Sequence, residues 1–109
     1  MRWQAEVREN ETVTFLHVGT TRALNVRLSV IPGDQPTRED TFGEVRPGGP
    51  VGMRLTAEVE EQRQLHQEEL AAAPADVPER SAKLRVLATV IWESPAGRVD
   101  SETVALTLQ

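Results

Sequence analysis

The chain has 109 residues, no cysteine and a formal net charge of −5 at neutral pH. This length supports one hydrophobic core, so we expect a single domain over residues 1–109. The lack of cysteine excludes disulfides, thiolate metal sites and cysteine nucleophiles. The acidic balance disfavours binding to a nucleic-acid backbone, which needs a dense basic surface.

The sequence shows no sign of membrane insertion or export. No apolar run approaches the roughly 20 residues that a spanning helix needs, and the first ten residues lack the apolar core of a secretion signal. If Met1 is the native start, the protein is expected in the cytoplasm; otherwise the chain is one module of a longer exported protein. Lys83 is the only lysine among many arginines, which is typical of a GC-rich bacterial genome.

The first third of the chain predicts three β-strands. Apolar and polar residues alternate over 3–8, 12–18 and 23–31, and such alternation is typical of strands with one buried face. The last two runs flank the short connection Gly-Thr-Thr-Arg at 19–22, which predicts either a hairpin or a pair of strands that cross between sheets. The buried face of the third strand is expected to carry Leu24, Val26, Leu28 and Val30.

The middle of the chain is more varied. The polar segment 34–41 predicts a loop, followed by a short edge strand at 42–46 and a turn at 47–50. Alternation over 53–59 predicts another strand. Residues 61–73 are strong helix formers and predict a short helix. This segment either lies over one end of the β-sheet structure or is a partly ordered insertion.

The last third predicts two strands joined by a tight turn. The inward face over 84–92 ends at Trp92, the turn is Ser-Pro-Ala-Gly at 94–97, and the final strand runs to Leu108. Leu87 and Ile91 fall on the opposite face, which indicates either a strand covered on both sides or an apolar outer patch.

About seven short strands, with no spacing typical of parallel strand–helix–strand units, predict the fold class. We expect an all-β, antiparallel, immunoglobulin-like β-sandwich with a short helix or ordered loop inserted at about 61–73.

Three motifs carry a resemblance to a known family. Phe15-Leu16-His17-Val18-Gly19 with Ala23-Leu24-Asn25-Val26, the corner at 42–48 and the Val-Ile-Trp hairpin at 90–97 follow one another in order. Together they resemble bacterial immunoglobulin-like modules of the cell-adhesion-related, CARDB type, with His17 where the family usually has Asn. The resemblance implies a spacer or binding surface and carries over no enzymatic residue.

The candidates for chemistry are two histidines and some carboxylates. His17, just before Gly19, is expected to make a turn-capping hydrogen bond. His66 and Glu69 lie three residues apart on the predicted helix and, with the acidic 34–40 loop, could bind a metal or a small ligand. Neither set forms a convincing catalytic group, so we expect no enzyme activity and no cofactor.

The leading functional hypothesis is therefore a non-catalytic structural or protein-interaction module; the alternative is the metal- or ligand-binding sandwich. A protein partner or a second copy is expected, and one form of self-association would bury Leu87, Ile91 and an edge strand. The predicted contact residues are apolar side chains expected at the surface: Trp3, Leu87, Ile91, Leu65 and Leu70.

Overall fold

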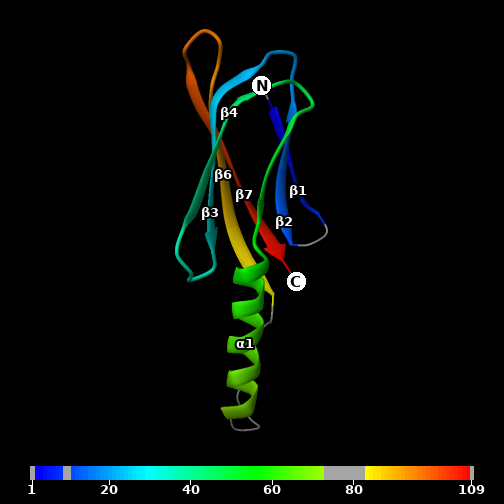
Figure 1. Ribbon diagram of the computed structural model, residues 1–109, viewed down its shortest axis with the longest axis vertical. Coiled ribbons are helices and arrows are strands. Elements are labelled where there is room, and N and C mark those ends of the chain that lie inside the picture. Colours follow the sequence, from blue (N-terminus) through cyan, green and yellow to red (C-terminus); the bar gives the residue numbers. More distant parts are fainter. Residues whose placement is uncertain (1, 9–10, 73–82, 109) are drawn as a thin grey trace.

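The computed structural model describes residues 2–8, 11–72 and 83–108, and it shows a β-sandwich with one helix at its end (Figure 1). The elements in chain order are β1 (Arg2–Arg8), β2 (Thr12–Val18), β3 (Ala23–Pro32), β4 (Arg38–Val45), β5 (Pro50–Arg54), α1 (Thr56–Ala72), β6 (Leu84–Glu93) and β7 (Val99–Leu108).

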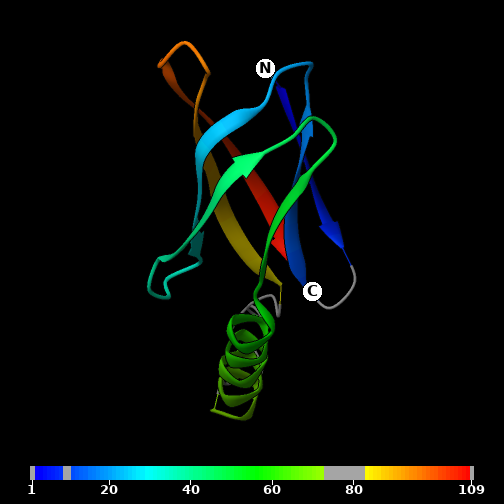
Figure 2. The same cartoon turned by 45° about the horizontal axis from the view of Figure 1, so that its top comes forward.

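Two antiparallel sheets face each other. One has the order β1-β2-β5 and the other β4-β3-β6-β7, which confirms the predicted all-β sandwich. In constant-type immunoglobulin domains the fourth strand pairs with the fifth. Here β4 instead pairs with β3, so it belongs to the four-stranded sheet and not to the sheet that contains β5. Figure 2, a view turned by 45°, shows the two sheets as separate layers.

The chain crosses from one sheet to the other between β2 and β3. β2 pairs with β1 and β5, whereas β3 pairs with β4 and β6. Of the two forms that the alternation predicted for this stretch, the sheet-crossing pair is therefore correct and the hairpin is wrong. The predicted β6–β7 hairpin is confirmed: Gly97, at a φ of 88°, donates its N–H to the Ser94 carbonyl at 2.8 Å.

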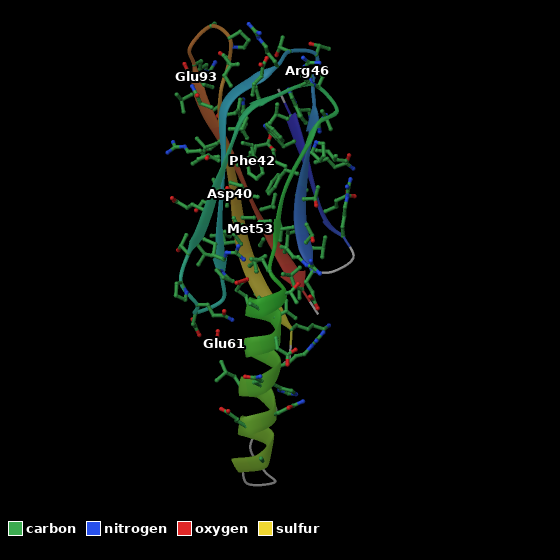
Figure 3. All side chains as sticks on the ribbon, in the orientation of Figure 1. Asp40, Phe42, Arg46, Met53, Glu61 and Glu93 are labelled. Atoms are coloured by element: carbon green, nitrogen blue, oxygen red, sulfur yellow. The ribbon has the colours of Figure 1, made fainter. Side chains whose placement is uncertain are left out.

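The core lies between the two inner faces, as alternation on facing sheets requires. Phe15 on β2, Leu28 on β3 and Val90 on β6 are fully buried there. Met53 on β5 also points inward, whereas Glu61 on α1 is exposed (Figure 3). Trp92 is 4% exposed, in agreement with its predicted core position.

Three predicted boundaries are wrong. The strand expected over 53–59 ends at Arg54, and α1 begins at Thr56, five residues before the expected start. The reason is that Leu55 and Val59, both fully buried, are four residues apart, a spacing that suits one face of a helix. The loop expected over 34–41 is also shorter, because β4 already begins at Arg38.

The first turn of α1 holds the helix to the sandwich. The Leu55 N–H donates to the Glu11 carbonyl at 3.0 Å, and the Arg38 guanidinium lies 3.1 Å from the Glu58 carboxylate, whose side chain is only 13% exposed. Beyond this turn the helix projects along the long axis of the molecule, which measures 58 × 22 × 19 Å. The helix therefore extends the end of the sandwich and does not lie across it.

Two leucines test how α1 is held. Leu55→Ala should lower the free energy of unfolding by about 2 to 5 kcal/mol, because it opens a cavity at the docked base of the helix. Leu65→Ala, at a position 42% exposed on the same helix, should change it by about 0.5 kcal/mol or less. Urea unfolding of both variants measures the difference, and equal effects would contradict docking through the first turn.

Candidate functional site

The part of the outer face of the four-stranded sheet that β3, β6 and β7 form carries few charges. Its central part consists of three rows of direct cross-strand neighbours on β3, β6 and β7: Arg27–Ile91–Ser101, Ser29–Thr89–Thr103 and Ile31–Leu87–Ala105. One of these nine side chains is charged, and β4 adds Thr41 and Glu39 at the edge of the first two rows. The remainder of the nine are apolar or short hydroxyl side chains.

The apolar row is exposed. Leu87 is 45% exposed and Ile31 is 43% exposed, and the two are direct partners on neighbouring strands. Because the two side chains adjoin on neighbouring strands, they form a small continuous apolar patch and not two isolated exposed residues. Of the two possibilities that Leu87 and Ile91 raised in the sequence, the structure shows the apolar outer patch.

The outer face of the other sheet offers a comparison within the same molecule. Its three central rows are Gln4–Leu16–Pro50, Glu6–Thr14–Gly52 and Arg8–Thr12–Arg54. Three of these nine residues are charged, and Glu6 and Arg8 form an ion pair at 2.6 Å. The central rows of β3, β6 and β7 are therefore less charged than the central rows of the other face.

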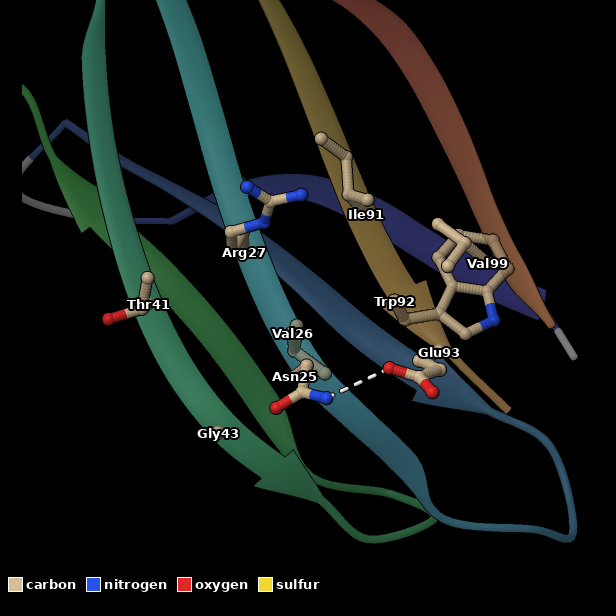
Figure 4. A pocket seen from close by; sticks show the side chains of 9 residues that line it. All are labelled: Asn25, Val26, Arg27, Thr41, Gly43, Ile91, Trp92, Glu93 and Val99. Carbon is tan, nitrogen blue, oxygen red and sulfur yellow. Dashed lines mark hydrogen bonds between the residues drawn. The ribbon is translucent and has the colours of Figure 1, made fainter. Parts of the chain in front are cut away.

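The outer face of the four-stranded sheet is hollowed beside β3 and β4, where Arg27, Glu39 and Asp40 are among the lining residues. Two adjoining hollows of about 340 and 290 Å³ share Arg27, Thr41 and Ile91 in their walls. The larger one extends to the end of the sheet, where the Asn25 amide donates to the Glu93 carboxylate at 2.9 Å (Figure 4). Apolar and polar groups thus line one continuous depression.

A bulge in β3 shapes this depression. The register of β3 shifts between Leu24 and Arg27, Asn25 has a φ of 49°, and Gly43 on β4 has a φ of 68°. Asn and Gly are the residues that most readily adopt this left-handed region. The extra residue moves Ala23 into the core and leaves Leu24 half-buried, so the prediction that Leu24 shares the buried face is wrong.

His17 lies in the core and serves the fold. Its side chain is 1% exposed, and its Nε2–H donates to the Thr21 carbonyl in the crossing between the sheets. Its own carbonyl accepts from the Gly48 N–H at 2.8 Å, and its N–H donates to the Gly49 carbonyl at 3.1 Å. The predicted turn-capping hydrogen bond is confirmed, and the residue joins the crossing to the turn before β5.

Trp3 is not a surface residue. Its side chain is 7% exposed, stacks on the His17 ring at 4.9 Å between centroids, and lies 5.7 Å from the Trp92 ring. The expected partial exposure is wrong because Trp3 is on the inner face of β1, where its ring closes the core beside the crossing. It therefore does not join Leu87 and Ile91 in the outer patch.

The predicted metal ligands do not assemble in the part of the chain that the structure describes. No three His, Asp or Glu side chains there lie close enough together to hold an ion. The Glu69 side chain lies outside the described residues, so its pairing with His66 is not placed. The 34–40 segment instead holds α1: the Gln35 amide donates to the Glu58 carbonyl at 2.9 Å, beside the Arg38 ion pair.

The helix does not extend the apolar patch. Leu65 is exposed, but it lies on α1, which projects away from the sheets (Figure 1). The Leu70 side chain is outside the described residues. Of the predicted contact residues whose side chains the structure describes, only Leu87 and Ile91 thus share one surface.

Sequence reasoning missed Ile31, which completes the apolar row. Its signal is visible in the sequence, because it alternates with buried Leu28 and Val30 on β3. The alternation does not show which residue of β6 lies beside it, however, and only the register of β3 against β6 places it opposite Leu87.

Comparison with family models, curated proteins and solved structures finds no match for this chain. The resemblance to CARDB-type modules therefore stays a prediction. Among the described residues, the single helix is too polar to span a bilayer.

The contact between His17 and Gly19 allows a test of whether the His17 ring is packed in the core. A Cβ on Gly19 would lie 2.8 Å from His17 Cε1, and the stacked, hydrogen-bonded ring cannot move aside freely. Gly19→Ala should therefore cost about 1 to 3 kcal/mol of unfolding free energy. In the His17→Ala background the same change should cost less than half as much, because the clash is gone. Denaturant unfolding of the four proteins measures this coupling, and additive effects would contradict the packing.

Proposed function

We propose that this chain is a non-catalytic protein-interaction module that contacts a partner protein through the outer face of the sheet β4-β3-β6-β7. The observation that carries the proposal is the exposed pair Ile31 and Leu87 within a nearly uncharged set of cross-strand rows. Burying these side chains at an interface would remove apolar surface from water, at about 25 cal/mol per Å².

The arrangement of polar groups supports a protein partner. Around the apolar pair, Arg85 lies on β6 beyond Leu87, Glu93 lies at the other end of β6, and Arg27 and Glu39 lie toward the β4 edge. Apolar residues at the centre with charges around them are the usual composition of a protein–protein contact. The depression along Arg27, Thr41 and Ile91 is a suitable place for anchoring side chains of the partner.

The state of the histidines supports the non-catalytic part of the proposal. A general acid or base must reach its substrate with a ring nitrogen. His17 is buried and bonded to Thr21, and His66 lies on α1 away from the hollows. The hollowed face thus holds no histidine among its described lining residues.

A matched pair of leucines tests this proposal, because Leu87 and Leu65 are 45% and 42% exposed and lie on different surfaces. Leu87→Arg should abolish capture of the partner that the unaltered chain retains from an extract of its native host, because it places a charge at the centre of the apolar row. Leu65→Arg should retain the same partner. Affinity capture with mass spectrometry makes the comparison, and melting curves show whether both variants remain folded. Retention of the partner by a folded Leu87→Arg variant would refute the proposed surface.

A further inference from the structure

β7 forms a long and regular edge of the four-stranded sheet. It is the last strand of the order β4-β3-β6-β7 and spans ten residues. Its pairing with β6 runs without a register shift from Val99 to Leu108, and it contains no Pro, Gly or Lys. Such an edge presents unpaired backbone N–H and C=O groups in the geometry that another strand can join.

The other three edges of the two described sheets are each interrupted or guarded. β4 has a register shift against β3 and carries Gly43 at positive φ, and β5 has only five residues and begins with Pro50. β1 carries the charged side chains Arg2, Glu6 and Arg8. Bulges, short strands, proline and charge are the devices by which sheet edges avoid pairing, so β7 is the edge best suited to it.

The side chains of β7 leave its edge open to another strand. Those on the outer face are short, among them Ser101, Thr103 and Ala105. On the inner face, Val104 and Leu106 pack against the core but stay half-buried, since no further strand of the described sheet follows β7. An added strand would cover this remaining apolar surface.

The charges of β7 favour a second copy in one orientation. Its acids, Asp100 and Glu102, lie in the first half, and the second half carries no charge. Antiparallel pairing about Val104 sets each Glu102 opposite Leu106 of the other copy. The two Glu102 carboxylates are then about 14 Å apart along the strands, which exceeds the screening length of about 8 Å in physiological salt. Parallel, in-register pairing would instead place them about 5 Å apart.

We propose that two copies of this chain associate through β7, antiparallel and centred on Val104, to form one continuous eight-stranded sheet. This pairing leaves Ile31 and Leu87 uncovered. It widens the outer face from about 14 Å to about 34 Å, at about 4.8 Å per strand spacing. The dimer thus presents the two Ile31–Leu87 pairs on one continuous sheet face, and the inference stands on the edge alone, independently of the partner proposed above.

Two double variants test both the pairing and its register, because Thr103 of each copy lies opposite Ala105 of the other. Thr103→Lys with Ala105→Glu would create two opposite-charge pairs across the dimer, whereas Thr103→Lys with Ala105→Lys would create two like-charge pairs. Both variants lose the same Thr89–Thr103 hydroxyl bond, so they are matched for this contact. Sedimentation from low micromolar to near-millimolar concentration gives the dimer dissociation constant.

We expect the unaltered chain to dimerise. The Lys/Glu variant should dimerise about fivefold or more tightly than the unaltered chain, and the Lys/Lys variant about fivefold or more weakly. General charge repulsion predicts the reverse order, because the Lys/Lys variant reduces the net charge from −5 to −3 while the Lys/Glu variant leaves it unchanged. That reverse order would overturn the proposed register.

Hydrogen exchange provides a measurement that needs no variant. Backbone amides of alternate β7 residues should exchange more slowly at high concentration than at low concentration, since the paired edge protects them. If the unaltered chain sediments as a monomer over the whole concentration range, the proposal is overturned, even if the β7 edge binds a strand of another protein. The Leu87→Arg comparison reports on the face and not on the edge, so the two proposals fail separately.

Discussion

The fold depends on how the chain passes from one sheet to the other between Val18 and Ala23. The strands on either side, β2 and β3, each lie inside their sheets, so this crossing sets the position of both layers. His17 holds it from the β2 side: the ring bonds to Thr21 in the crossing, and the backbone bonds to Gly48 and Gly49 in the turn before β5. Because breaking a buried hydrogen bond leaves its polar groups unpaired at a cost in free energy, these hydrogen bonds restrict the path that the chain can take.

The aromatic side chains add packing to this hydrogen-bonded point. Trp3 stacks on the His17 ring and also contacts Trp92, so residues from β1, β2 and β6 meet at the crossing. The two sheets are thereby tied at one end, while α1 is held at the other by Leu55, Glu58 and Arg38. The functional consequence is a separation of roles. His17, in the core, maintains the fold, and the exposed sheet face between the two tied ends is the surface that we propose for a partner.

The sequence was most informative where one local pattern determines the structure. Alternation predicted the strands, the Ser-Pro-Ala-Gly turn predicted the last hairpin, and the position of His17 before Gly19 predicted its hydrogen bond. It was less informative where two patterns overlap. Met53 and Leu55 fit a strand, but Leu55 and Val59 fit a helix equally well, and the strong helix formers that follow decide for the helix. The bulge at Asn25 was also hidden, because one extra residue reverses the faces before it without disturbing the composition. The apolar pair Ile31 and Leu87 depends on the register between two strands more than 50 residues apart, which no local pattern encodes.

Native-state hydrogen exchange tests most directly whether the crossing is the structural centre of this protein. The amides of His17 and Gly48, which close the hydrogen bonds between β2 and the turn before β5, should open with the same free energy as the amides of Leu28 and Val90 in the central strands. Equal opening free energies would show that the end of β2, beside the crossing, leaves the turn before β5 only when the whole sandwich unfolds. Much lower values at His17 and Gly48 would show that the crossing opens locally, and would contradict the account.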